Sequence, residues 1–561
     1  MEWLQNYDPF GAPVASTLLA AAPICLLLGL LVAGIAAERA AIAGLLAALG
    51  VAILGFGMPT GPALAAAANG AAYGLLPIGW IVVAAVFMFH LTVVSGQFDV
   101  VKRSVAAISS DQRMQALLIA FSFGTFVEGA AGFGTPVAIS AALLIGLGFS
   151  PLYAAGLALL ANTSPVAFGA LGTPIIMLAK VSGLDEMELS QMAGRQLPLF
   201  SLIVPAWLVA VMSGWRGVRE CWPAIAMCGG SFAGLQFLTS NFHGPTLVDV
   251  IGGLGSLVAL AVFLQFWQPA VVWRFPDAAP APVEKTRLTR GAIMYAWMPW
   301  VILSVMVFLW GWPSFKTALN GGTTENPNAL AGISKLTFEV PGLHNVVYPT
   351  APVANVAPGR DRADKPLPAT YDLNWLSATG TGIFLAAIIT AFWLRIAPGV
   401  FVRQFFETLW RMRLALVTIA CMLGLAFVTK FSGADATLGL AFTHTGWLYP
   451  FFAPLLGWLG VALTGSDTSS NALFGSLQKI TAEQLNLPPV LIVGSNSTGG
   501  VMGKMIDAQS IVVAAVATEQ NGGEGAILRF VFPHSIALAC LVGLLTLVQA
   551  YLMTWMIPGG P

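Results

Sequence analysis

Runs of apolar residues follow one another along almost the whole chain. A helix that crosses the hydrocarbon core of a bilayer needs about 20 predominantly apolar residues, and ten runs approach that length. The pattern therefore predicts an all-α polytopic membrane protein. The ten runs cover approximately residues 14–35, 40–58, 75–95, 197–214, 222–240, 248–267, 293–311, 373–396, 414–431 and 528–557.

Two further apolar regions are interrupted by polar residues and glycine, which a water-soluble core does not need. Residues 124–136 (GTFVEGAAGFGTP) place the carboxyl group of Glu128 among glycines. Residues 464–475 (TGSDTSSNALFG) place Asp467 among hydroxyl groups. Glycine lets the backbone turn, and proline suits the first turn of a new helix. Each region is therefore predicted to be a hairpin of two helices.

The layout of the first region is repeated in the second. After each hairpin come a proline and an apolar run broken by small polar residues, ANTSPVAFGALGTP from Ala161 and GSNSTGGVMGKMIDAQS from Gly494. The prolines, at 151 and 488, are 488 − 151 = 337 positions apart, and Glu128 and Gly465 also differ by 337. Residue identity across this offset is poor. The repeat is one of layout, in which each hairpin precedes a broken transmembrane helix.

The basic residues predict how the hairpins enter the membrane. Lysine and arginine cluster within residues 102–113, 216–219, 274–290 and 395–413, and the positive-inside rule places those loops in the cytoplasm. All of these basic loops lie in the cytoplasm if the hairpin at 115–149 enters the membrane from the cytoplasm and returns there. An odd number of crossings then brings the hairpin at 447–486 in from the opposite face and leaves both chain ends outside. Such an inverted-topology repeat is typical of secondary transporters.

This interpretation divides the chain into parts that serve either a scaffold or a transport unit. The parts are N-terminal scaffold helices (1–114), the first hairpin and broken helix (115–196), central helices (197–311), an extracytoplasmic polar loop (312–372), further scaffold helices (373–431), the second hairpin and broken helix (432–526) and a C-terminal helix (527–561).

Composition excludes several classes of function. The chain is 57% hydrophobic and 9% charged with a net formal charge of zero, so no electrostatic attraction favours nucleic acid as a partner. It lacks the phosphate-binding Gly-x-x-x-x-Gly-Lys-Ser/Thr pattern and the His-Glu-x-x-His and Gly-x-Ser-x-Gly patterns. The sequence predicts neither an enzyme nor an ATP-driven pump, and no metal or cofactor site.

The interrupted helices suit an anion. Helix starts inside a membrane present free N–H groups and the positive end of the helix dipole, which favour a carboxylate. Lys504 is the cation inside the second broken helix. Its ammonium group has two roles open to it, which do not exclude each other. One is contact with a substrate carboxylate, and the other is structural pairing with Asp507 or Asp467.

Glu128 and Asp467 are the candidates for carrying a proton. An ionised acid at the bilayer centre costs on the order of 3 kcal/mol or more, so such residues are functional hypotheses by default. His90, in VFMFHLTVV, also titrates near neutral pH. It ranks below the two acids, because a single histidine in an apolar span is more often a packing residue.

Five stretches of this sequence are long and uncommon: GTFVEGAAGFGTPVAISAALLIGLGF, NTSPVAFGALGTPI, GRQLP, LTGSDTSSNALF and STGGVMGKMIDAQSI. They closely resemble the L-lactate permease family, which includes glycolate permeases, and the likeness runs from NYDPF to AYLMTWMIP. The resemblance implies proton-linked uptake of L-lactate, D-lactate and glycolate across the bacterial inner membrane without a cofactor. It also implies hairpins that move the substrate by an elevator-like step.

Two positions depart from the family pattern. His90 stands where members carry lysine, which puts an essential cationic role there in doubt. Asp507 and Ala508 stand where members carry Ser-Pro, which argues against Asp507 as a shared proton carrier. We predict proton coupling at Glu128, Asp467 and His90. The residues predicted to bind the substrate are Thr135, Asn162, Thr163, Ser164, Thr468, Ser469, Asn471, Asn496, Thr498, Lys504 and Gln509.

The sequence thus predicts a secondary active transporter that imports a short 2-hydroxymonocarboxylate with a proton. Moving one negative charge against an inside-negative potential costs about 2.3 kcal/mol per 100 mV, and a co-transported proton cancels that charge. Sodium coupling is the nearer alternative, because Asn, Ser, Thr and broken-helix carbonyls also suit that ion. A channel would not accumulate substrate, and a receptor is expected to carry a signalling domain. A homo-oligomer is compatible with such a scaffold by analogy.

Overall fold

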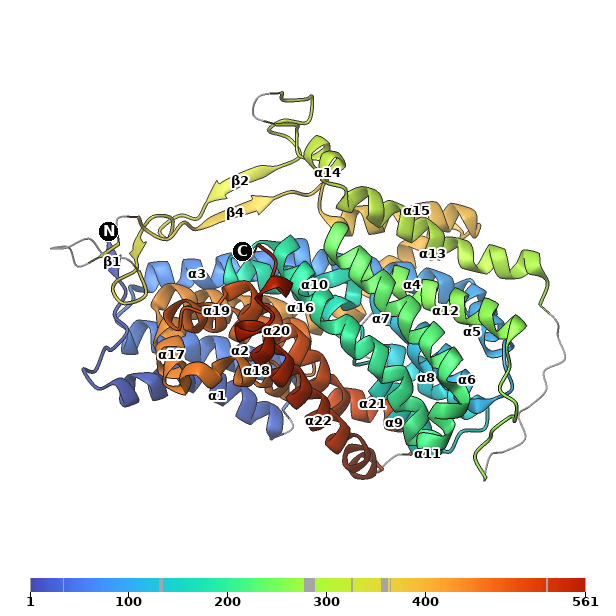
Figure 1. Cartoon of the computed structure of the whole chain (residues 1–561). Coiled ribbons are helices and arrows are strands. Elements are labelled where there is room, and N and C mark those ends of the chain that lie inside the picture. The colour runs from blue at the N-terminus through green and yellow to red at the C-terminus, as the bar shows by residue number, and fades with distance from the viewer. Residues whose placement is uncertain are drawn as a thin grey trace.

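The computed structural model describes residues 2–33, 35–130, 135–276, 288–323, 326–354, 362–363, 365–520 and 523–559. Within these ranges most residues are helical (Figure 1). Eight helices of the described chain are long and apolar enough to cross a membrane, or nine if a bent pair counts as one span. The prediction of a multi-pass helical membrane protein is confirmed at this level.

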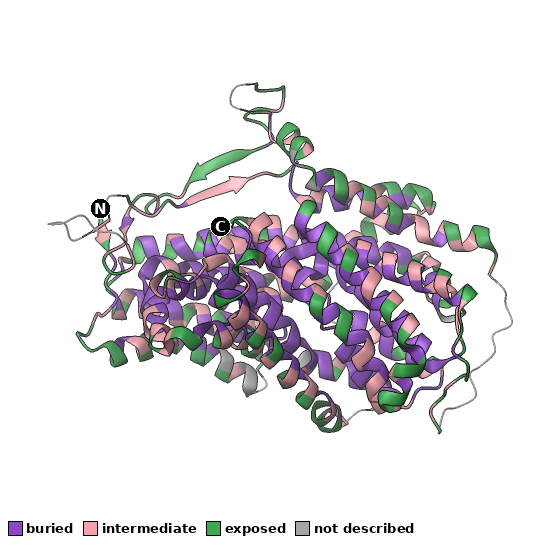
Figure 2. Ribbon diagram, viewed as in Figure 1, coloured by how far each residue is buried: buried purple, intermediate pink, exposed green. Residues whose placement is uncertain are grey.

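Burial follows the pattern that a lipid environment imposes (Figure 2). Large apolar side chains face outward, and Leu54, Phe266 and Phe392 are 87%, 85% and 80% exposed. Polar side chains such as Gln196 and Asn496 are fully buried instead. Soluble monomers rarely expose so much contiguous apolar surface, so these faces are suited to lipid.

One group of helices packs around the long helix α16. It contacts α2, α3, α4 and α17, and α4 in turn packs on α15, which packs on α13. The bounds are α1 Pro13–Val32, α2 Ala37–Gly50, α3 Thr60–Tyr73, α4 Trp80–Val94, α5 Gln97–Ala106, α13 Arg290–Gly311, α14 Pro313–Leu319, α15 Thr379–Trp393, α16 Pro398–Ser432 and α17 Ala434–Phe442.

The other group contains the two predicted hairpins and the two broken helices. Its bounds are α6 Gln112–Gln115, α7 Gly124–Ala130, α8 Thr135–Gly146, α9 Pro151–Ala161, α10 Gly169–Ser182, α11 Glu186–Phe242, α12 Val248–Phe266, α18 Tyr449–Thr464, α19 Asp467–Gln484, α20 Pro489–Gly503, α21 Ala508–Ala517 and α22 Glu524–Tyr551. Each half of this group has the same order, a helix pair, a broken helix and a long helix.

Two helices differ from the predicted spans. The Ala-rich segment α3 was not predicted as a helix, yet alanine is the best helix former, and a Cβ at its Gly70 would lie 2.3 Å from the Leu423 carbonyl oxygen of α16. α11 extends through both predicted spans 197–214 and 222–240 and breaks at Gly214, where φ is 66°. Apolar runs underestimate such helices, because buried polar residues such as Gln196 continue them.

The all-helical prediction is wrong for the polar segment 312–372, which contains short β-strands. Strand β2 (Leu336–Glu339) pairs antiparallel with β4 (Thr370–Leu373), and β1 (Trp3–Leu4) pairs parallel with β3 (Val347–Tyr348). The N-terminal strand therefore lies against this segment, and α22 ends toward the same side (Figure 1).

Both helix pairs form hairpins. In hairpin 1 (residues 112–146) the Ser140 hydroxyl donates to the Ile119 carbonyl at 3.2 Å, so its two helices lie side by side. In hairpin 2 (residues 449–484) the Gln478 amide donates to the Ala453 carbonyl at 2.8 Å. Residues 131–134, between the helices of hairpin 1, lie outside the described residues. The tip of hairpin 2 lies at Gly465, whose φ is 73°.

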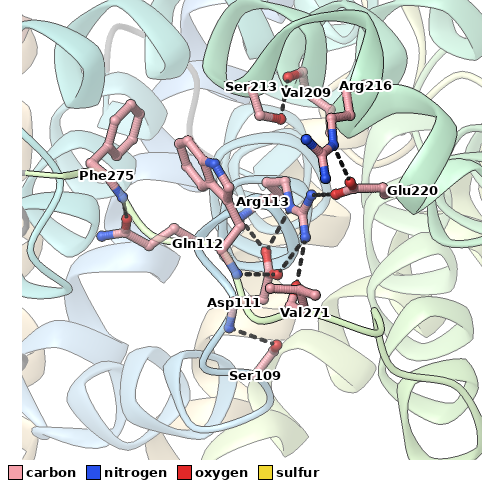
Figure 3. A network of polar contacts seen from close by, with 11 residues as sticks. Ser109, Asp111, Gln112, Arg113, Val209, Ser213, Arg216, Glu220, Val271 and Phe275 are labelled. Carbon is pink, nitrogen blue, oxygen red and sulfur yellow. Dashed lines mark hydrogen bonds and ion pairs between the residues drawn. The ribbon is translucent and has the colours of Figure 1, made fainter.

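The base of hairpin 1 is held by a buried ion network (Figure 3). The Arg113 guanidinium, only 1% exposed, donates to Asp111 at 2.9 Å, to Glu220 of α11 at 2.8 Å and to the Val271 carbonyl at 3.0 Å. Arg113 was counted among the basic loop residues, but it is a buried structural cation. The network fixes hairpin 1 to the chain that follows α12.

The bases of the two hairpins contact different connections of the chain. Hairpin 1 begins beside Val271, which lies in the connection before α13. Hairpin 2 ends where the Gln484 amide donates to the Pro352 carbonyl of the polar segment, which follows α13. The placement of these ends in a membrane stays a prediction.

Each broken helix packs against the long helix of the other half. α9 and the segment from Val166 to Ser182 meet at a bend of 61°, and α20 is separated from α21 by a 3₁₀ turn at Lys504–Ile506. α11, which follows the first broken helix, packs on α20. α22, which follows the second, packs on α9. Each half therefore supports the interruption of the other.

Glycines bring hairpin 2 against the second broken helix. A Cβ at Gly457 of α18 would lie 1.9 Å from the Asn496 carbonyl oxygen, and one at Gly499 of α20 would lie 2.0 Å from that of Pro454. Small residues allow this backbone approach where no hydrophobic force drives helices together. Hairpin 1 meets α12 similarly, since a Cβ at Gly253 would lie 2.5 Å from the Phe126 nitrogen.

This close packing predicts that Gly499→Ala destabilises the protein. The added methyl group must displace backbone, and overpacking costs about 1–3 kcal/mol, so the apparent Tm in detergent should fall. Gly234→Ala is the matched control, because a Cβ there meets nothing within 4 Å and alanine is the better helix former. Equal Tm values for the two variants would contradict the packing argument.

Candidate functional site

A small cavity lies where residues of both hairpins and both broken helices meet. Its volume is about 70 Å³. The first half contributes Glu128 and the start of α10, and the second half contributes the tip of hairpin 2 and Lys504. The lining residues are Glu128, Val166, Gly169, Ala170, Pro174, Gly465, Ser466, Asp467, Thr468 and Lys504.

Lys504 connects the two interruptions of the second half. Its ammonium group donates to the Gly465 carbonyl at the tip of hairpin 2, at 2.6 Å, and pairs with Asp507 at 3.2 Å. Asp507 also accepts from the Ser510 N–H at 2.8 Å and so caps α21. The structural pairing predicted for Lys504 is therefore present with Asp507. The same side chain lines the cavity, so contact with a ligand remains open to it.

Asp467 is held by two side chains. The Ser497 hydroxyl donates to its carboxyl group at 2.5 Å, and the Asn471 amide does so at 3.4 Å. Asn471 also donates to the Pro174 carbonyl of α10 at 3.1 Å and accepts from Asn496 at 2.9 Å. Asp467 opens α19, which Ser466 caps by accepting from the Ser469 N–H. These bonds place its carboxyl group at the cavity.

Glu128 faces the break of the first half. Its carboxyl group accepts from the Asn162 amide at 3.1 Å, and a Cβ at Gly169 would lie 2.5 Å from its second oxygen. Ala170 and Leu171 have φ of 43° and 58°, although left-handed backbone costs non-glycine residues about 1–2 kcal/mol each. Such strain gathers at functional sites when the surroundings enforce it.

The structure brings only part of the predicted site to the cavity. Glu128, Asp467, Thr468 and Lys504 line it, while Asn162 and Asn471 donate to Glu128 and Asp467. Ser469 donates its backbone N–H to the hydroxyl of Ser466, another lining residue. Asn496 reaches it through Asn471. The side chains of Thr135 and Gln509 lie outside the described residues.

The remaining predicted residues lie elsewhere. Thr163 donates to the Leu160 carbonyl of its own helix, and Thr498 donates to Gln196 of α11. Ser164 is buried, and its hydroxyl has no partner among the described residues. His90 lies on α4, where its Nδ1 is 3.2 Å from the Thr408 hydroxyl of α16. Roles for these side chains stay predictions.

The sequence analysis did not identify Ser497 or Asp249, which lie beside the candidate site and hairpin 1. Ser497 makes the shortest bond to Asp467, although only its neighbours were singled out in the GSNSTGG run. Asp249, at the start of α12, is 1% exposed and lies against hairpin 1. The available signal was an acid inside the otherwise apolar run TLVDVIGGLG.

The cavity combines features that attract an anion with two carboxyl groups that repel one. The starts of α10 and α19 and the Lys504 ammonium group supply positive potential. Glu128 and Asp467 bring two carboxyl groups to the same cavity.

The fold and this site define the class, a multi-pass membrane transport protein and not an enzyme. The family model described as L-lactate permease matches residues 16–553, and the chain belongs to that family. It is 46% identical to the L-lactate permease of Salmonella typhimurium over 561 residues, which cover 99% of this chain and 100% of that one. The corresponding Bacillus subtilis protein is 46% identical over 100% of both chains.

Another relative has a different name. The glycolate permease of Escherichia coli is 47% identical over 571 residues, covering 99% of each chain. Among solved structures, the Alcanivorax borkumensis YdaH transporter aligns over 88% of each chain with 12% identity and a TM-score of 0.45, a likeness too low to carry an argument.

Proposed function

We propose that this protein imports L-lactate, and also D-lactate and glycolate, by proton symport across the bacterial inner membrane. The names of its relatives support the substrates. The observation that carries the coupling is the 70 Å³ cavity lined by one ammonium group and two carboxyl groups. The proposed movement is an elevator-like step of two re-entrant hairpins that enter from opposite faces.

The charges at the cavity favour protons as the coupling ion. Lys504 supplies one positive charge, and Asp507 already neutralises it at 3.2 Å. Glu128 and Asp467 lack a cation of their own in hydrogen-bond contact within the described residues. An incoming carboxylate would add a further negative charge in a dry site, which is costly. Protons on the acids remove that cost and also cancel the charge that crosses the membrane.

Sodium is the second candidate because buried oxygen atoms at the first break lack a hydrogen-bond partner. The Asn162 amide oxygen and the Ser164 hydroxyl are buried, and neither has a partner among the described residues. Oxygen atoms of broken helices are of the kind that bind sodium in transporters. We still favour the proton as the coupling ion. A sodium ion at the first break would not neutralise Asp467, which lines the cavity from the second half.

The energy source is tested by radiolabelled lactate uptake into proteoliposomes in which pH, sodium and voltage are set independently. Uptake should rise as the outside is acidified, collapse with a protonophore and proceed without sodium, because the anion needs proton-bearing acids. Uptake that requires sodium and persists without a proton gradient would establish the alternative ion. Passive equilibration without accumulation would indicate a channel.

The inverted placement of the hairpins is tested by labelling single cysteines on a cysteine-free background. A cysteine at Ser150 should react with an impermeant reagent from the cytoplasmic side and one at Asn486 from the outside. Arg290→Cys at the start of α13 and Lys335→Cys in the polar segment are the matched controls for the two sides. If both test positions react from one side, the inverted repeat is wrong.

Lys504 and Asp507 can be separated by substitution. Lys504→Ala should weaken lactate binding roughly tenfold to hundredfold, since a hydrogen bond to a charged group contributes about 1.5–3 kcal/mol. Asp507→Asn breaks the same ion pair but keeps an N-cap acceptor, so binding should change less than about threefold. Calorimetry on the purified variants measures both. Equal losses would show that the ammonium group acts only through the ion pair.

A further inference from the structure

A buried series of hydrogen bonds, the amide relay, runs from Tyr449 through hairpin 2 and α20 to Asp467. The Tyr449 hydroxyl donates to the Gln478 amide oxygen at 2.7 Å, and the Gln478 amide nitrogen donates to the Asn496 oxygen at 3.1 Å. Asn496 donates to the Asn471 oxygen at 2.9 Å, and Asn471 donates to Asp467 at 3.4 Å. The four side chains before Asp467 are each 0% exposed, so bulk solvent offers them no other partner.

Two backbone carbonyls fix the direction of the amide relay, because a carbonyl oxygen can only accept. The Gln478 amide nitrogen also donates to the Ala453 carbonyl at 2.8 Å. The Asn471 amide nitrogen also donates to the Pro174 carbonyl at 3.1 Å. Both N–H groups of each amide are then in use, and their oxygens are left to accept from the preceding member. Every donor therefore points toward Asp467.

The amide relay reaches one oxygen of Asp467 and leaves the other open. Oδ2 accepts from Asn471 and, at 2.5 Å, from the Ser497 hydroxyl. Oδ1 has no partner among the described residues, and Asp467 lines the cavity. Aligned hydrogen bonds polarise one another and strengthen the last bond of the series. The relay thus stabilises negative charge on Oδ2, and Oδ1 is the oxygen that can take a proton.

The charged groups around Asp467 come from several elements. Glu128 of α7 and Lys504 line the same cavity, and Asp507 pairs with Lys504 at 3.2 Å. α18 and α20 carry no charged side chain. The other helices that pack on α19 carry three that do not line the cavity: Lys180 of α10, Lys430 in the last turn of α16 and Asp435 in the first turn of α17.

We propose that Tyr449, Gln478 and Asn496 are positioning residues, which set the pH at which the Asp467 carboxyl group binds and releases the coupling proton. This inference rests on the proposed proton symport. The proton bonds to Oδ1 from the outside solution and leaves the same atom for the cytoplasmic solution, so Asp467 returns to its starting charge. The donors on Oδ2 stay in place throughout, because α18 and α20 are packed backbone to backbone at Gly499.

The test measures lactate binding to the purified protein by calorimetry as a function of pH. Binding that needs a protonated acid weakens as the pH rises, and loss of a donor makes the anion less stable, so the midpoint should move to higher pH. Ser497→Ala removes a direct donor and should move it by about one unit. Gln478→Met cuts the amide relay farther away and should move it by about 0.2–0.5 unit, since each aligned bond adds about 10–30%.

Three further variants separate the amide relay from unrelated structural effects. Tyr449→Phe combined with Gln478→Met should match Gln478→Met alone, because the relay is already cut nearer to Asp467. Gln478→Met in an Asp467→Asn background should leave the remaining pH dependence unchanged, because no carboxyl group ends the relay. Tyr73→Phe is the matched control and should bind as wild type, since it removes a hydroxyl of a buried tyrosine that bonds the Thr370 carbonyl outside the relay.

Each outcome decides the assignment. A midpoint that stays at the wild-type pH or falls in Gln478→Met would overturn it, and so would additive shifts in the double variant or an equal shift without Asp467. If Gln478→Met does not fold, Tyr449→Phe, which keeps every amide, takes its place with a smaller shift to higher pH. Accumulation by wild type on a sodium gradient alone would refute the symport and the role of the relay in it. Proton-driven wild type with unmoved variants would refute the relay alone.

Discussion

The ammonium group of Lys504 makes the interaction on which the second half of the site depends. Backbone that leaves a helix inside an apolar protein exposes carbonyl groups that no lipid can satisfy. Lys504 donates to one of these, Gly465 at the tip of hairpin 2, and pairs with Asp507, which caps the continuation of the broken helix. One side chain thus stabilises two interruptions that lie 39 residues apart. Lys504 thereby couples the break to the hairpin tip.

The first half stabilises its break in another way. Its break is held by left-handed backbone at Ala170 to Gly172, and Glu128 packs closely against Gly169. The repeat is therefore symmetric in layout and asymmetric in charge, because the first half brings Glu128 to the cavity and the second half brings Asp467 and Lys504.

Charged residues and glycine or proline breaks inside apolar runs could be recognised from the sequence. Glu128, Asp467 and Lys504 stand out because charge is rare in apolar runs, and all three line one cavity. The hairpins were visible because glycine and proline interrupt those runs. The boundaries of the helices were not, since α3 is made largely of alanine, whose weak hydropathy conceals a good helix. Long-range partners were also invisible, because nothing local connects Asp249 with Gly129 or Lys504 with Gly465.

Packing restricts how the cavity can open. α18 and α20 meet backbone to backbone at Gly457, Gly499 and Gly503, so hairpin 2 cannot swing out alone without giving up contacts that no side chain could replace. Hairpin 1 is fixed to α12 at Gly253 and by the Arg113 network at its base. Close-packed interfaces do not deform continuously, and conformational changes therefore tend to move packed elements as rigid bodies. Each hairpin is therefore expected to move together with the helix it packs on, which favours a rigid-body step over local opening of a tip.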